Sequence, residues 1–479
     1  MDILEFLAGL DTYKYLVVIV LILFDIVAIF SIIWRSQGVE RTLTWLFAVI
    51  AFPAFGGFLY FFLTHQPIKQ SRKRKRITRR IIQESNSTES NINTPEYNNP
   101  VLNLTYSLTG LEATTNNMIE VHTENENAFT RIGEVVRAAK KFIWVEYYII
   151  KKDYTGRKFM GLLSELAKSG IEIRLLYDAY GSASLDPKAI KELRDAGGKV
   201  VSFNPFNPFR SRWSFYLRNH RKLIVVDGEV AFTGGMNISD EYSGRNRRRG
   251  YNYFRDTHLL LSGETVADLA NVFREDWAYS TNGEVLPFVP KKKIEIGKST
   301  VAILPSDPDQ FQNVTALVFF EALNRAQKNI YLTSPYFIPD EPIMRALECA
   351  VLRGVDVRLV VPFKSDVILA RQAAVSYYAQ LIPVGVKVYE YIPSMLHAKT
   401  LIVDDYLSVV GSANLDIRSF RLNFELNALI LDTDIAKKLT NKFFQDVKKS
   451  QQIDPVVFAK RGIKRRITER IARLLSPLL

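Results

Sequence analysis

The pattern His-x-Lys-x4-Asp occurs twice in this 479-residue chain, and each copy is followed at the same offset by Gly-x-x-Asn. In both copies the asparagine lies 17 residues after the histidine. The two copies comprise His220, Lys222, Asp227, Gly234 and Asn237, and His397, Lys399, Asp404, Gly411 and Asn414. Because the chain has only five histidines, two of them in one template are hard to assign to chance. The repeat therefore constrains this chain to two related parts.

The sequence around the motifs repeats as well. Ala139-Lys-Lys-Phe-Ile-Trp-Val resembles Ala326-Gln-Lys-Asn-Ile-Tyr-Leu, and both read as a helix end followed by a buried strand. Strands that alternate with helical stretches predict an α/β fold. We expect two homologous halves, about 105–290 and 291–460. If the halves pack about a pseudo-twofold axis, the two motifs meet at one cleft.

These residue types suit phosphoryl transfer through a covalent intermediate. A neutral imidazole is a nucleophile, and its reference pKa near 6.5 lets one histidine be neutral while the other is protonated. Histidine and lysine two apart on a strand share a face, so each pair points into the same cleft. Lys222, Lys399, Asn237 and Asn414 can then hold the phosphate oxygens. This chemistry requires no metal or other cofactor, and the sequence offers no obvious metal site.

Several other side chains near the motifs invite a role. Asp227 and Asp404 stand at strand ends, where a carboxylate more plausibly holds local geometry than touches substrate. Asp256 and Glu425 follow their motif histidines by 36 and 28 residues. We expect them to orient the imidazoles, as the third member of a triad does, with a surface or interface ion pair as the alternative. His258 is expected to be structural.

The doubled motif resembles the signature of the phospholipase D superfamily, and its flanking segments are similar to those of the bacterial cardiolipin synthase family. Those segments are Asn219-His-Arg-Lys, Gly234-Gly-Met-Asn-Ile-Ser-Asp-Glu-Tyr, Arg255-Asp-Thr-His, Pro335-Tyr-Phe-Ile-Pro-Asp, Leu396-His-Ala-Lys and Asn414-Leu-Asp-Ile-Arg-Ser-Phe. One departure is Gly235, where serine is usual in the superfamily. A phosphate contact from a hydroxyl is lost there, while Ser412 keeps it in the second half.

The resemblance implies that one phosphatidylglycerol gives its phosphatidyl group to a histidine and releases glycerol. A second phosphatidylglycerol then attacks through a glycerol hydroxyl and yields cardiolipin. By analogy His220 is the nucleophile, and His397 protonates glycerol and later accepts a proton. The motifs are nearly symmetric and leave this assignment open. They also leave open another phosphatidyltransferase or a hydrolytic phospholipase D, whereas their intact histidines and lysines argue against a non-catalytic lipid-binding scaffold.

Two apolar runs precede the body. Tyr15–Trp34 and Leu43–Leu63 are each long enough to cross a hydrocarbon core of about 30 Å, so residues 1–66 predict a transmembrane helical hairpin. Residues 69–80 carry eight basic and no acidic side chains, which predicts a body on the cytoplasmic side of the membrane. The resemblance implies that this is a bacterial plasma membrane. The two arginines within 35–42 argue weakly for the opposite orientation.

The positive charge is concentrated on two flanks. Residues 67–104 read as a basic segment and a polar linker, and 461–479 as a basic amphipathic helix. Residues 69–80 and 461–479 carry net charges of +8 and +5, which account for the formal net charge of +13. A nucleic-acid-binding protein more often carries such an excess on its folded domain, so we expect anionic membrane lipids rather than nucleic acid as partners. The C-terminal helix either lies on anionic lipid, which we favour, or packs its apolar stripe on the body.

Two single residues complete the predictions. Asp25, in the middle of the first apolar run, either has a direct role or pairs with a polar group on the second helix. Cys349 is the only cysteine, which rules out an internal disulfide, and we expect it to be a small buried side chain on a helix. The sequence does not specify the oligomeric state.

Overall fold

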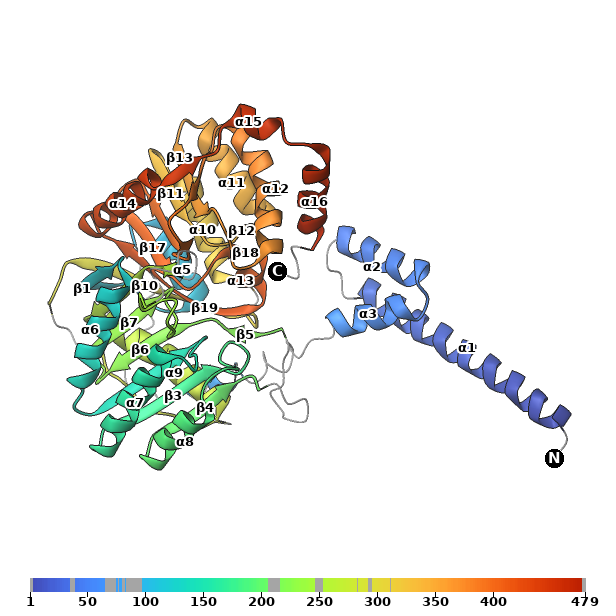
Figure 1. Cartoon of the computed structure of the whole chain (residues 1–479), viewed down its shortest axis with the longest axis horizontal. Coiled ribbons are helices and arrows are strands. Elements are labelled where there is room, and N and C mark those ends of the chain that lie inside the picture. The colour runs from blue at the N-terminus through green and yellow to red at the C-terminus, as the bar shows by residue number, and fades with distance from the viewer. Residues whose placement is uncertain are drawn as a thin grey trace. The chain divides into compact units, whose positions relative to one another are not determined.

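The computed structural model of the chain divides into two compact units, Met1–Gln70 and Ser71–Leu479 (Figure 1). It describes residues 3–34, 39–64, 75, 77–79, 82, 97–205, 216–245, 253–281, 283–291, 295–310 and 312–475. Parts of the predicted basic segment and polar linker lie outside these residues, namely 65–74, 76, 80, 81 and 83–96, as do 35–38 and 476–479.

The first unit consists of α1 (Ile3–Trp34), α2 (Val39–Ala51) and α3 (Phe55–Thr64). Among the described residues, the segment of α1 from Tyr13 to Trp34 is long and apolar enough to cross a membrane, with a mean hydropathy of 3.2 over 18 of its residues. The second predicted span is divided between α2 and α3. The break lies at Pro53, which has no amide donor, and Ala54 follows with a φ of 64°.

Asp25 closes this break in the second apolar segment. Its Oδ2 accepts a hydrogen bond of 2.7 Å from the amide of Ala54, at the start of α3. A carboxylate at a helix N-terminus satisfies a free amide and interacts favourably with the helix dipole. A Cβ on Gly57 would lie 2.7 Å from Asp25 Oδ1, so the close approach requires glycine. Of the two expected roles of Asp25, the geometry favours pairing within the hairpin.

The second unit is built on one sheet that runs through both halves (Figure 1). The order in the first half, from the centre outward, is β1 (Thr114–His122), β9 (His258–Ser262), β7 (Val230–Gly234), β6 (Lys222–Val226), β2 (Phe142–Tyr147), β3 (Glu172–Asp178) and β4 (Lys199–Phe203). In the second half it is β10 (Ser299–Ser306), β19 (Asn423–Leu431), β17 (Leu407–Gly411), β16 (Thr400–Val403), β11 (Asn329–Thr333), β13 (Asp356–Pro362), β14 (Lys387–Tyr391) and β20 (Ser450–Gln452).

The halves meet where β1 pairs antiparallel with β10, through Thr114 opposite Val301 and Asn117 opposite Ser299. On either side of this seam the equivalent strands follow in the same order outward. In each half the central strand, β2 or β11, pairs antiparallel with its inner neighbour and parallel with its outer one. Equivalent strands that meet antiparallel relate the halves by a pseudo-twofold axis. The predicted α/β fold with two homologous halves is thus confirmed.

Helices cover both faces of the sheet. Their bounds are α5 (Pro100–Thr109), α6 (Asn125–Arg137), α7 (Tyr154–Lys168), α8 (Pro187–Asp195) and α9 (Thr265–Ser280), then α10 (Val314–Arg325), α11 (Glu341–Leu352), α12 (Ile368–Val384), α13 (Ile417–Arg421), α14 (Thr433–Lys448), α15 (Pro455–Ala459) and α16 (Ile463–Leu474). Cys349 lies on α11 but is exposed, so its predicted burial is wrong.

Alternation along the strands explains the three layers. In β2, Ile143 joins the apolar core formed with α6, α7 and α8, whereas Trp144 faces the other side and stacks on Phe273 of α9. In β11, Tyr331 likewise stacks on Phe443 of α14. Each half is therefore a sheet between helices, with an apolar core on each face.

Candidate active site

Short strands connect each motif to the opposite half. They are β5 (Arg218–Asn219), β8 (Phe254–Arg255) and β15 (Met395–Leu396). Strand β5 runs parallel to the start of β19, and β15 runs parallel to β8. The backbone amide of His220 donates to the carbonyl of Phe424 at 2.9 Å, and that of His397 donates to Arg255 at 2.7 Å. The backbone of each histidine is thus fixed by a strand of the other half.

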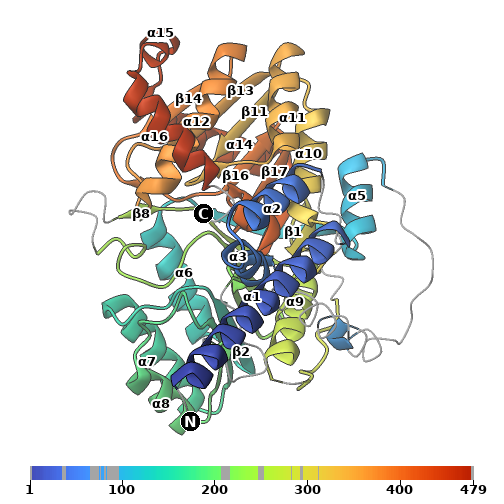
Figure 2. The same ribbon diagram turned by 90° about the vertical axis from the view of Figure 1, so that its right-hand side faces the viewer.

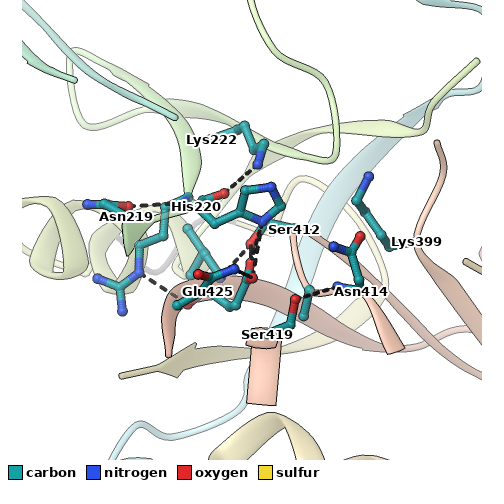
Figure 3. Close-up of polar contacts among 12 residues, drawn as sticks. Asn219, His220, Lys222, Lys399, Ser412, Asn414, Ser419 and Glu425 are labelled. Atoms are coloured by element: carbon teal, nitrogen blue, oxygen red, sulfur yellow. Dashed lines mark hydrogen bonds and ion pairs between the residues drawn. The ribbon is translucent and has the colours of Figure 1, made fainter. Parts of the chain in front are cut away.

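The carboxylates that follow these strands contact the imidazoles in a crossed arrangement. Nδ1 of His220 lies 3.0 and 3.1 Å from the two carboxylate oxygens of Glu425 (Figure 3). Nδ1 of His397 lies 2.7 Å from Oδ2 of Asp256. Both carboxylates are fully buried. Contact through Nδ1 leaves Nε2 of His220 to face a substrate, the arrangement of a nucleophile that a carboxylate orients. Nε2 of His397 lies 3.4 Å from both the Tyr242 hydroxyl and Lys399 Nζ.

Gly235 and Ser412 occupy equivalent positions beside these carboxylates. Ser412 donates its hydroxyl to Glu425, and its oxygen accepts the amide of Leu426 at 2.9 Å. A Cβ on Gly235 would lie 2.1 Å from Oδ1 of Asp256. The shorter carboxylate of the first half therefore fills the space that a serine side chain would need. This close approach explains why Gly235 departs from the superfamily pattern. In the second half, the Ser412 hydroxyl is bonded to Glu425.

The two motif lysines are buried and donate to the backbone carbonyl of the histidine two residues earlier, Lys222 to His220 at 2.5 Å and Lys399 to His397. Lys399 Nζ also lies 3.5 Å from Asp256 Oδ2. Figure 3 shows Lys222, Lys399 and Asn414 around the space beside the His220 ring. Side chains of both motifs thus converge on one place, where two lysine amino groups can bind a phosphate. Burial lowers the pKa of both lysines, that of Lys222 well below its usual value, and the charge of a bound phosphate favours their protonated forms.

Burial controls the protonation of this site. It lowers the pKa of His220 to about 4, and the nearby Lys222 acts in the same direction while Glu425 opposes it. Burial and the charge of Lys399 also lower the pKa of His397, against the effect of Asp256. Both rings are therefore neutral near neutral pH. Burial alone would raise the pKa of Glu425, but His220 and Lys222 lower it to about 2, so this carboxylate is charged.

The two motif asparagines differ in their surroundings. Asn237 accepts the amide of Ile149 at 3.3 Å and donates to the hydroxyl of Tyr242 at 3.1 Å. Asn414 is 6% exposed, and its side-chain oxygen has no hydrogen-bond partner among the residues that the structure describes. A buried unpaired carboxamide atom at the edge of the site is available to a ligand.

Asp227 and Asp404 lie at the far ends of the motif strands and bind backbone amides. Asp227 accepts from the amides of residues 140, 141 and 142 at 2.7 to 2.9 Å. Asp404 accepts from those of residues 327, 328 and 329 at 2.7 to 3.1 Å. Both residues have positive φ, 54° and 52°. They join the turn after the motif strand to the start of the neighbouring strand and do not reach the histidines.

Tyr242 belongs to the site although no motif drew attention to it. Its hydroxyl lies 3.1 Å from Nδ1 of His397, and its ring lies nearly at right angles to the imidazole, at 85°. The ring of Phe254 contacts both Tyr242 and His397. A cavity of about 440 Å³ opens here, lined by Tyr242, Phe254, Lys364 and Asp366 among others. The segment Gly234-Gly-Met-Asn-Ile-Ser-Asp-Glu-Tyr ends at Tyr242, so the only sequence signal for it was the resemblance of that segment.

Comparisons with known proteins agree on one family. The family described as "Cardiolipin synthase, PLD-like domain" matches residues 132–277 and 319–447, and "Phospholipase_D-nuclease N-terminal" matches 23–63. A cardiolipin synthase of Geobacillus sp. (strain WCH70) is 38% identical over 94% of this chain and 91% of its own. The probable cardiolipin synthase YwiE of Bacillus subtilis (strain 168) is 36% identical over 99% of this chain and 94% of its own.

Among solved structures, a phosphatidylserine synthase of Haemophilus influenzae Rd KW20 superposes with a TM-score of 0.59. The match covers 80% of this chain and 100% of that one at 16% identity. At this level of identity the likeness concerns the fold alone.

Proposed function

The chain belongs to the cardiolipin synthase family of phospholipase D-like phosphatidyltransferases, and we propose that it joins two phosphatidylglycerol molecules into cardiolipin and glycerol. The observation that carries this proposal is the pair of crossed histidine–carboxylate contacts with both lysines beside them. Such a site offers a nucleophile, a proton carrier and positive charge to a single phosphodiester.

In the first step, Nε2 of His220 attacks the phosphorus of the donor lipid, and the bond from phosphorus to the glycerol oxygen breaks. His397 gives its Nε2 proton to the departing oxygen, so glycerol leaves neutral. The ring of His220 becomes a positively charged phosphoimidazolium, which the charged carboxylate of Glu425 stabilises. Lys222 and Lys399 bind the non-bridging oxygens as their charge grows.

In the second step, a free hydroxyl of the acceptor's glycerol attacks the same phosphorus. His397 takes the hydroxyl proton, the bond between phosphorus and Nε2 breaks, and cardiolipin leaves. Proton transfer through His397 requires its protonated form in the first step, although burial favours the neutral ring. A bound phosphodiester brings a negative charge next to His397 and raises its pKa, so substrate binding itself prepares the acid.

Two observations favour His220 as the nucleophile. Its ring contacts both oxygens of Glu425, which suits a residue that carries a full positive charge as a covalent adduct. His397 lies instead beside the cavity of about 440 Å³, where Tyr242 reaches the same ring. We assign this cavity to the glycerol of the lipid that exchanges protons with His397.

The proposed location is the bacterial plasma membrane, with the N-terminal hairpin crossing it twice. The apolar segment of α1 and the match of residues 23–63 to the family's N-terminal region support membrane anchoring. The basic residues between 69 and 80 support a catalytic unit on the cytoplasmic side.

The direct test uses the purified chain in anionic micelles with phosphatidylglycerol alone, without nucleotide or metal. The proposal predicts release of glycerol together with cardiolipin. Phosphatidic acid as the product would identify a hydrolytic phospholipase D. A requirement for a CDP-activated lipid would identify another phosphatidyltransferase.

A further inference from the structure

Helix α16 is held against α12 by one face, and its opposite face is exposed and apolar. Glu469 and Ala472 of α16 are buried on the face that packs against the catalytic unit. Glu469 is paired with Arg461 at 3.2 Å and with Arg465 at 3.1 Å, and the guanidinium of Arg473 lies 4.3 Å from the ring centre of Tyr377 on α12. Figure 2 shows α16 along the outer side of α12. These contacts fix which face of α16 points to solvent.

The exposed face carries a continuous apolar stripe. Its members are spaced at one turn of a helix and have exposed fractions of 75% for Ile463, 51% for Ile467, 54% for Ile471 and 79% for Leu474. Of the two roles expected for this stripe, the structure therefore does not show the alternative in which it packs on the body. Large apolar side chains in a contiguous exposed row mark an interaction surface.

Arginines lie between the packed face and the apolar stripe. Arg466, Arg470 and Arg473 line a cavity of about 600 Å³ between α12, α15 and α16, together with Arg461 and apolar side chains such as Phe458. From Arg461 to Leu475 the chain has six basic residues and one acidic residue, Glu469. A basic cavity beside an apolar stripe matches the phosphate and the acyl region of an anionic phospholipid.

We propose that α16 docks on an anionic bilayer, with its apolar stripe at the boundary of the acyl chains. The arginine-lined cavity then receives the phosphate of a lipid that is bound but does not react. This second lipid site holds the catalytic unit on the membrane surface independently of the N-terminal hairpin. The occupant is an anionic phospholipid because such a lipid has both acyl chains that match the apolar stripe and a phosphate that matches the basic cavity.

The test uses the full chain in a Cys349→Ser background, with Ile467→Cys carrying an environment-sensitive fluorophore. The protein is reconstituted into phosphatidylcholine vesicles with or without phosphatidylglycerol, and the emission is quenched with doxyl-labelled lipid. Ser169→Cys, at the exposed end of α7, is the matched control. The proposal predicts strong quenching at Ile467 in anionic vesicles, little at Ser169, and a loss of the Ile467 quenching in Arg466→Gln/Arg470→Gln.

Quenching at Ile467 that equals the control would overturn membrane docking. Equal quenching with and without phosphatidylglycerol, or no effect of the arginine variant, would overturn the anionic site. The double variant should keep wild-type turnover in detergent micelles, where no bilayer has to be bound, and lose turnover in vesicles. Loss of turnover in both would show damage to the fold and contradict a separate lipid site.

A second inference rests on a buried ion cluster behind the His220 strand. Arg221, next to His220, bridges Asp276 and Asp307, and all three are at most 2% exposed. Arg79, which is 29% exposed, pairs with both Asp307 and Glu275, so Arg221 and Arg79 together face three carboxylates and leave one negative charge unbalanced. Lys75 is also fully buried, contacts Asp276 and lies 3.5 Å from Asp307. It comes from the basic segment that precedes the catalytic halves in the sequence.

This cluster continues to the residues that orient His220. Nε of Arg221 donates to the backbone carbonyl of Glu425 at 3.1 Å. The Lys75 ammonium lies 5.1 Å from the ring centre of Phe424, whose carbonyl accepts the amide of His220. Burial alone would lower the pKa of Lys75, but Asp276 and Asp307 raise it above its usual value, so the ammonium is charged.

We infer that Lys75 is a positioning residue for phosphatidyl transfer. By balancing Asp276 and Asp307 it keeps Arg221 on the backbone of Glu425, and Glu425 on His220. The inference rests on the proposed function, and wild-type synthesis of cardiolipin tests that function separately. It also assigns at least one residue of the predicted basic segment to the catalytic unit.

The test compares Lys75→Met with Lys298→Met, which removes an exposed lysine paired with Asp434. Lys75→Met should lower kcat per active site by about 10- to 100-fold with KM nearly unchanged, because the nucleophile is misplaced rather than lost. Active sites are counted by burst titration with an activated phosphatidyl ester. Adding Asp307→Asn removes the unbalanced charge and should restore most of kcat. An unchanged kcat per site in Lys75→Met, or a double variant no better than the single one, would overturn the inference.

Discussion

The carboxylate of Glu425 lies 3.0 Å from Nδ1 of His220, a residue that precedes it by 205 positions in the chain. The equivalent contact in the other half joins Asp256 to His397 at 2.7 Å. Each half thus provides one imidazole and the carboxylate that orients the other. Neither half contains both a histidine and the carboxylate that orients it, so the site requires both halves in their packed arrangement.

Glu425→Gln should lower kcat for cardiolipin formation by about 10³-fold, because glutamine keeps the size of the side chain but cannot stabilise a charged phosphoimidazolium. Glu341→Gln, at a side chain that is 76% exposed, is the control and should be neutral. Steady-state release of glycerol measures both. A Glu425→Gln enzyme within a few-fold of wild type would remove Glu425 from the mechanism.

Gly235→Ser should damage the site even though it restores the residue usual in the superfamily. The new Cβ would meet Asp256 at 2.1 Å and displace its carboxylate from His397, so we expect a loss of kcat of about 10²-fold. Gly161→Ser is the control, because a Cβ there meets nothing within 4 Å. Ser412→Gly removes the hydrogen bond to Glu425 and the acceptor of the Leu426 amide, and should lower the free energy of unfolding by about 2 kcal/mol. Normal kinetics in Gly235→Ser would contradict the proposal that Asp256 fills the space that a serine side chain would need at position 235.

Asp227→Ala should destabilise the catalytic unit without abolishing the chemistry. Three backbone amides lose their acceptor, which costs about 2 kcal/mol or more and lowers the melting temperature. Turnover per titrated active site should stay near that of wild type, since the carboxylate does not reach His220. Asp195→Ala, at an exposed end of α8, is the control. A collapse of turnover per active site with an unchanged melting temperature would give Asp227 a direct catalytic role.

Acid should destabilise the fold through buried histidines outside the mechanism as well as within it. Burial lowers the pKa of His258 to about 3 from the usual value of 6.5. Below about pH 6.5, the His258 side chain therefore binds a proton in the unfolded chain but stays neutral in the folded one. By pH 5 this difference lowers the free energy of unfolding by about 2 kcal/mol. His258→Asn should flatten the fall in melting temperature between about pH 7 and 5. An unaltered pH profile would show that His258 does not titrate in this way.

The sequence predicted the composition of the site better than its geometry. The repeated spacing singled out His220 and His397, and the alternation of strands and helices predicted the two halves, because such patterns follow directly from periodic structure. It carried no signal that Glu425 and Asp256 cross between halves. The strands that align them, β5 and β15, have two residues each, too few for a recognisable period.

Other features depended on neighbours that are remote in the chain. Gly235 departed from the expected serine for a reason visible only beside Asp256. Lys75 read as one charge in a basic run, yet its partners Asp276 and Asp307 lie more than 200 positions later. The second apolar run had the length of a span, but Pro53 and Asp25 divide it into α2 and α3.

The most direct test of the two-histidine mechanism uses His397→Ala with a phosphatidyl ester of p-nitrophenol. This leaving group departs without a proton, so His220 can still attack, but no residue remains to activate the acceptor alcohol. The account predicts a stoichiometric burst of p-nitrophenol and a phosphatidyl group that mass spectrometry locates on His220. A label on any other residue, or a burst that persists in His220→Ala/His397→Ala, would contradict it.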